Sequence, residues 1–147
     1  MDEKTIKALL IRGIEKLFDI DKMYFERIVI LKEVVDDIID LARANHPREF
    51  VAFLHGSIKK KRLEIDSLVY QEFKSDETSA TPIFHFPDKS FYGSVHSHPS
   101  GSIRPSRADR QFFRKVGIVN IIIASPYAQE DMVFYSHEAE RIDVGIG

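Results

Sequence analysis

Apolar residues recur along this chain with two different periods, which predict both helices and strands. In three segments they return every three or four positions, the spacing that gives a helix one apolar face. The predicted helices cover residues 6–18, 32–45 and 107–116. The third helix follows Ser106, and Gly117 is expected to end it.

Other short segments are rich in aromatic and β-branched residues, which is typical of strands. The predicted strands are 26–31, 50–54, 91–98 and 118–124, a strand–turn–strand unit over 54–73, and two shorter strands at 132–135 and 141–146. Asp66 is expected to break that unit, and residues 74–82 form a polar loop. The order of elements predicts a single mixed-sheet α/β domain with helices on both sides and an extra N-terminal helix.

We predict two parts, an N-terminal helical extension over residues 1–24 and the α/β domain over residues 25–147. Two interpretations of the leading helix stay open. It packs on its own domain, or it pairs with a second copy and makes a homodimer.

The composition is that of a soluble globular protein, with 44% hydrophobic and 30% charged residues among 147. The chain has no cysteine, which excludes a disulfide framework and the usual cysteine-rich structural zinc site. Charges at Lys4, Lys7, Arg12 and Glu15 interrupt the first segment, so a signal peptide and a membrane partner are not expected. A cytoplasmic location follows from these expectations.

A basic run, residues 59–62, carries enough positive charge to suggest an anionic partner. It lies between two apolar segments, so we interpret it as a solvated hairpin turn. The formal net charge is −2 and no aromatic residues interleave the run, so nucleic acid is not an expected partner.

The candidate metal-binding residues lie in the run HSHPSGSIRPSRAD, residues 96–109. His96 and His98 are two apart in a predicted strand, so their side chains project from the same face. Asp109 lies one turn into the helix that follows, and the start of that helix faces the end of the strand. Two imidazoles and one carboxylate could therefore surround one metal ion.

Three protein ligands with a free position for water are typical of catalytic zinc. Zinc lowers the pKa of the water it binds from ~15.7 to about 7, and a base must then move the proton. Glu49 is the best candidate base, because it precedes the predicted strand 50–54 and can reach such a water without binding the metal.

These residues resemble the JAMM, or MPN-plus, metalloprotease family, whose pattern is a glutamate, then HxHP, then a serine and an aspartate. The matching positions are Glu49, His96, His98, Pro99, Ser106 and Asp109. The resemblance implies the cytidine-deaminase-like MPN fold and one Zn2+ per chain, held by His96, His98 and Asp109. It also implies that Glu49 is the acid and base and that Ser106 stabilises the tetrahedral oxyanion.

The resemblance further implies a substrate. Members of this family cleave the bonds that join ubiquitin or small ubiquitin-like modifiers to target amines, so such modifiers or their conjugates are the expected partners. The chain lacks room for the long insertions of eukaryotic ubiquitin-specific members, and a compact prokaryotic, archaeal-type isopeptidase fits better.

Several alternatives stay open. Ser106 and Asp109 also match a capping box, and Glu49 could be a surface carboxylate. The chain could be a non-catalytic MPN scaffold, or a non-haem iron protein, since two histidines and one carboxylate also form that site. The segment from His98 to Asp109 also resembles RadC-type proteins linked to DNA repair, although those usually carry asparagine where this chain has Ser97.

Overall fold

The computed structural model describes residues 3, 25–70 and 90–147, and in this part of the chain seven strands form one sheet. The strands are β1 (Arg27–Ile30), β2 (Val51–Lys59), β3 (Arg62–Tyr70), β4 (Phe91–His98), β5 (Val119–Ala124), β6 (Met132–Tyr135) and β7 (Gly145–Ile146). The helices are α2 (Lys32–Asn45), α3 (Arg107–Val116) and the short 3-10 helix η2 (Gln129–Asp131). The predicted N-terminal extension and the polar loop 74–82 lie outside the described residues, and among those described no helix is long and apolar enough to cross a membrane.

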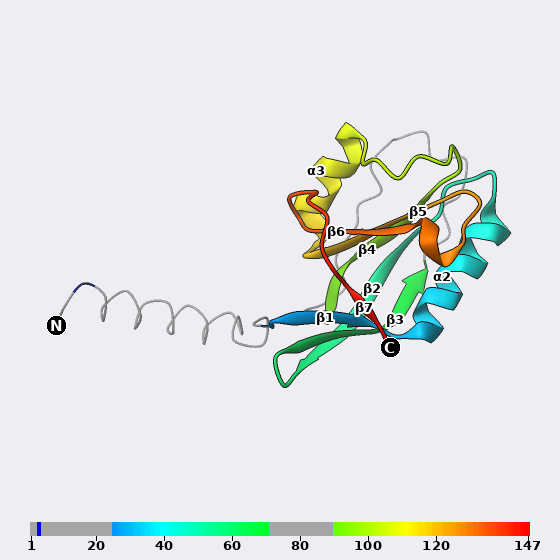
Figure 1. Cartoon of the computed structure of the whole chain (residues 1–147). Coiled ribbons are helices and arrows are strands. Elements are labelled where there is room, and N and C mark those ends of the chain that lie inside the picture. The colour runs from blue at the N-terminus through cyan, green and yellow to red at the C-terminus, as the bar shows by residue number, and fades with distance from the viewer. Residues whose placement is uncertain (1–2, 4–24, 71–89) are drawn as a thin grey trace.

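The sheet is mixed, with the strand order β6-β5-β4-β2-β3-β1-β7. β4 runs parallel to β5, and β1 runs parallel to both β3 and β7, while the other neighbours are antiparallel. β2 and β4 therefore lie side by side in the middle of the sheet (Figure 1). This pairing brings the segment before β2 next to the end of β4.

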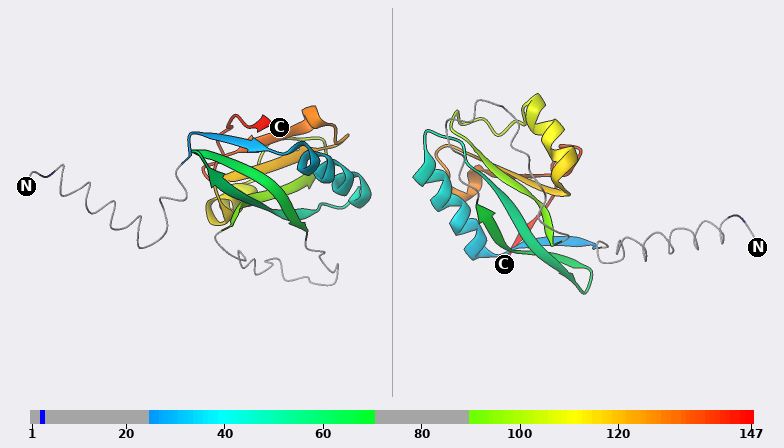
Figure 2. Two further views of the ribbon diagram at one scale, coloured as in Figure 1. Left: turned by 90° about the horizontal axis from the view of Figure 1, so that it is seen from below. Right: turned by 180° about the vertical axis from the view of Figure 1, so that it is seen from behind.

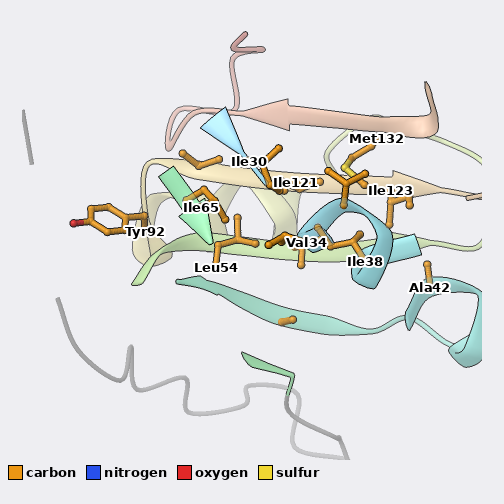
Figure 3. Packing of buried hydrophobic residues seen from close by; sticks show 14 of the residues in the cluster. Ile30, Val34, Ile38, Ala42, Leu54, Ile65, Tyr92, Ile121, Ile123 and Met132 are labelled. Carbon is orange, nitrogen blue, oxygen red and sulfur yellow. The ribbon is translucent and has the colours of Figure 1, made fainter. Parts of the chain in front are cut away.

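Helix α2 covers one face of the sheet. Val34, Ile38 and Ala42 recur at helical spacing and are fully buried, and they face Ile121 and Ile123 of β5 (Figure 3). These two isoleucines are two residues apart, so they project from the same side of their strand. The main core of the domain therefore lies between α2 and the sheet.

Helix α3 lies across the opposite face (Figure 2). Its fully buried Phe113 packs with Ile122 and Tyr135, and Ile122 lies on the side of β5 that points away from α2. The two described α-helices, α2 and α3, thus lie on opposite sides of a mixed sheet, which confirms the predicted α/β class and its layers.

Two predictions for the strands are corrected. Asp66 does not break the strand, because β3 continues through it and Asp66 is the extra residue of a β-bulge where the pairing with β2 shifts. Residues 141–146 do not form one strand, since Arg141 makes a bridge with Tyr135 of β6 and only Gly145–Ile146 pairs with β1. That short segment joins both edges of the sheet, so the sheet must curl.

Candidate metal centre

The two histidines of the motif lie side by side at the end of β4. Strand alternation places His96 and His98 on the α3 face and turns Ser97 toward the other face. The ring centroids of the histidines are 4.8 Å apart, and their Nε2 atoms are 3.0 Å apart. The His96 ring also lies 6.0 Å from the ring of Phe113 in α3, which limits its movement.

The carboxylate near these histidines belongs to Asp109, in the first turn of α3. Ser106 is the N-cap, where its Oγ accepts a hydrogen bond from the Asp109 amide at 3.0 Å. The Ser106 amide donates in return to Asp109 Oδ2 at 2.8 Å, which completes a capping box. The cap therefore fixes the orientation of the Asp109 carboxylate toward the sheet.

Among the described residues, His96, His98 and Asp109 form one group whose ligand atoms all lie within 4.8 Å of one another. Asp109 Oδ1 lies 3.1 Å from His96 Nε2, and Asp109 Oδ2 lies 3.1 Å from His98 Nε2. Atoms bound to one zinc at about 2.0–2.1 Å and at tetrahedral angles are about 3.3 Å apart. The observed contacts are close to that separation, so the three side chains fit a zinc-sized ion.

The protonation states of His98 and Asp109 also favour a bound cation. His98 Nδ1 donates to the Ser102 carbonyl at 2.7 Å, which leaves the Nε2 lone pair of the neutral ring pointing at the other two side chains. Burial alone would raise the pKa of Asp109, but hydrogen bonds from His96 and His98 outweigh it and hold that pKa well below its usual range. The hydrogen bond with Asp109 raises the pKa of His98, although burial opposes this change. A proton or a metal ion therefore stabilises the cluster.

Glu49, the predicted base, is not a member of the metal-ligand group. Val51 pairs with His96, so continuing this antiparallel register by two residues brings Glu49 opposite His98. The Ser97 amide donates to the Phe50 carbonyl at 3.2 Å, which extends the pairing in that direction. Glu49 is solvent-exposed, and its charge contributes to the raised pKa of His98. Its position thus agrees with a base beside the metal, while its role stays a prediction.

Ser106 is also exposed and adjacent to the ligand group. Its Oγ accepts the Asp109 amide, so the hydroxyl proton can still be donated to another acceptor. The capping interpretation of Ser106 and Asp109 is confirmed, and it is compatible with the predicted oxyanion role, which stays untested.

Two further residues beside the site were not predicted. Ser97 is fully buried, and its Oγ accepts the amide of Phe50, the residue after Glu49, at 3.0 Å. Tyr127 is also buried, and its hydroxyl lies 2.7 Å from Nδ1 of His46 in the segment before Glu49. The position of Ser97 within HSHP could have drawn attention to it, but no local signal marks Tyr127.

Comparison with known proteins identifies the family. Residues 31–138 match the family described as prokaryotic homologs of the JAB domain. The chain belongs to this JAMM/MPN family. A probable metalloprotease of Haloferax volcanii is 31% identical over 131 residues, which cover 82% of this chain and 80% of that protein.

Solved structures of the family share the fold. A JAB1/MPN domain protein from Archaeoglobus fulgidus is 31% identical, with a TM-score of 0.65 over 80% of this chain and 97% of the other. A JAMM structure described as a metalloprotease-like zinc site in the proteasome and signalosome is 28% identical, with a TM-score of 0.63 over 83% of this chain and 99% of that one. These relatives support a metalloprotease-like protein with a metal ion at the His96, His98 and Asp109 group.

Proposed function

We propose that this chain is a zinc-dependent isopeptidase or peptidase that hydrolyses the bond at the C-terminus of ubiquitin-like small modifier proteins. One Zn2+ per chain would be held by His96 Nε2, His98 Nε2 and the Asp109 carboxylate. The observation that carries the proposal is the convergence of these atoms at 3.0–3.1 Å. The register of β2 against β4, continued by two residues, brings Glu49 toward His98. The metalloprotease-like relatives support the same reaction class.

The donor set suits zinc better than the cations that prefer oxygen ligands, because two of its three groups are imidazoles. The cluster is also well shielded, with side-chain exposures of 6% for His96, 12% for His98 and 17% for Asp109. When bound, zinc would supply a Lewis acid that polarises the scissile carbonyl and acidifies a water molecule. The cap on Asp109 and the Nδ1 hydrogen bond of His98 would keep two of the ligands oriented.

Two exposed side chains beside the cluster would transfer the proton and stabilise the negative charge of the oxyanion. Glu49 would take a proton from the attacking water as its oxygen bonds to the amide carbon. Glu49 would then give this proton to the departing lysine nitrogen as the carbon–nitrogen bond breaks. The Ser106 hydroxyl would donate a hydrogen bond to the carbonyl oxygen while that oxygen carries negative charge.

The decisive experiment separates metal binding from turnover. Wild type, Glu49→Gln and the control Glu33→Gln, an exposed glutamate in the first turn of α2, are loaded with zinc and assayed on an isopeptide-linked modifier conjugate. We expect all three to hold one zinc per chain and only Glu49→Gln to lose cleavage, by at least about 100-fold.

Other outcomes would contradict the proposal. Full turnover by Glu49→Gln would exclude Glu49 as the base. Inactivity of zinc-loaded wild type on conjugates and on peptides would favour a scaffold. Stoichiometric iron in protein purified without added metal would overturn the zinc assignment.

A further inference from the structure

The segment that carries Glu49 is held at its C-terminal side by β4. Phe50 follows Glu49 directly, and its amide donates to Ser97 Oγ at 3.0 Å while its carbonyl accepts the Ser97 amide at 3.2 Å. Phe50 is 1% exposed, so these two bonds are shielded from water. The residue after the predicted base is therefore fixed to the strand between the two histidines.

The same segment is held at its N-terminal side by a residue 81 positions away in the chain. The Tyr127 hydroxyl lies 2.7 Å from His46 Nδ1, and the two rings meet edge to face with centroids 5.5 Å apart. His46 caps the end of α2, and the Arg48 amide donates to the Asn45 carbonyl at 2.8 Å. Only Pro47 and Arg48 separate the contacted histidine from Glu49.

Burial and backbone hydrogen bonds restrain the position of Tyr127. It is 3% exposed, and its backbone φ of 65° lies in the left-handed region that bulky residues rarely adopt. The Tyr127 amide donates to the Ala124 carbonyl at 2.8 Å, and the preceding Ser125 amide donates to the His98 carbonyl at 3.1 Å. The turn after β5 thus contacts both a predicted zinc ligand and the segment of the predicted base. Backbone strain kept in place beside a site is typical of a functional constraint.

Tyr127 and His46 share a hydrogen bond between the phenol hydroxyl and Nδ1. Burial raises the pKa of Tyr127, and the nearby charge of Glu49 raises it further, so the phenol keeps its proton. The tautomer of His46 decides whether the phenol or Nδ1 donates, and in either case the bond needs the Tyr127 hydroxyl.

We propose that Tyr127 is a positioning residue for Glu49, which it acts on through its hydrogen bond to His46. The inference rests on the proposed function, because it assigns Glu49 the role of base. Tyr127 and Ser97 hold the two ends of one short segment, and together they keep the Glu49 carboxylate opposite His98. A displacement of about 1 Å at a reacting group can slow a reaction about 100-fold, so this restraint is large enough to matter.

The test compares Tyr127→Phe with Tyr70→Phe. The Tyr70 hydroxyl donates to the Asn45 side chain at 3.1 Å, so the control removes the same atom at the same end of α2 without touching His46. We expect Tyr127→Phe to lower kcat by about 10-fold to 100-fold and to leave KM and zinc content unchanged. We expect Tyr70→Phe to behave as wild type.

A double-mutant cycle asks whether Tyr127 acts through His46. His46→Ala and Tyr127→Phe should each lower kcat, and the double variant should lose no more than the larger single loss. Losses that multiply would show that Tyr127 does not act through His46 and would overturn the proposal.

Amide hydrogen exchange gives a readout that does not need activity. The Arg48 amide should exchange faster in Tyr127→Phe than in wild type or Tyr70→Phe, while amides in the middle of β2 stay unchanged. Unchanged exchange at Arg48 would overturn the positioning role even if the wild type cleaved no conjugate. Inactive wild type with faster exchange in Tyr127→Phe would instead contradict the proposed function alone.

Discussion

Replacement of Ser97 by alanine tests whether the buried contact between β4 and the start of β2 contributes to stability. Ser97 and Phe50 are 0% and 1% exposed, so water cannot replace the lost hydroxyl. The Phe50 amide would then be buried without its acceptor, which costs about 1–3 kcal/mol. For a domain of this size, each kcal/mol lowers Tm by about 2–4 °C, so we expect a drop of about 2–12 °C.

The assay is thermal and urea unfolding of metal-free protein, because bound zinc would add its own stabilisation. Ser57→Ala is the matched control, since the Ser57 side chain in β2 makes no hydrogen bond to the residues that the structure describes. We expect this control to stay within about 0.5 kcal/mol of wild type. A Ser97→Ala variant as stable as the control would refute the argument that the Phe50 amide depends on Ser97.

Two further predictions concern the metal centre. The hydrogen bond with Asp109 raises the pKa of His98, so zinc must displace a proton that is held more tightly than in an ordinary histidine. Zinc affinity, measured by competition with a chelator, should therefore fall about tenfold per pH unit below that pKa, and equal affinity at about pH 8 and about pH 6 would contradict this. Ser106→Ala should lose about 1 kcal/mol of stability with the cap, while Ser106→Gly should lose only a few tenths of a kcal/mol. If the hydroxyl also stabilises the oxyanion, both variants lose about 100-fold or more in kcat, and an active Ser106→Gly would leave Ser106 as a cap only.

Local structure could be predicted where the signal lies within one segment. The bounds of α2 and α3 match the predicted helices 32–45 and 107–116, because apolar spacing and caps are properties of neighbouring residues. The basic run is a hairpin turn as predicted, with Lys60 and Lys61 both at positive φ between β2 and β3. The contact of His96 and His98 also followed from their spacing of two in a strand.

Contacts between distant segments could not be predicted in this way. The strand order, with β1 beside β3, depends on pairings that leave no local pattern. No local pattern indicates the partner of His46, and only the fold reveals that this partner is Tyr127. The segment 141–146 has the composition of a strand, but its two ends bond to opposite edges of the sheet.

The curl of the sheet limits how much strand edge the described domain exposes. The outermost strands, β6 and β7, are four and two residues long, and residues 141–147 bind along both edges. Gly147 even exchanges hydrogen bonds with the backbone of Ile30 and Lys32. Short or covered edge strands resist the intermolecular strand pairing that starts many aggregates. The described domain therefore presents only short strand edges to neighbouring chains.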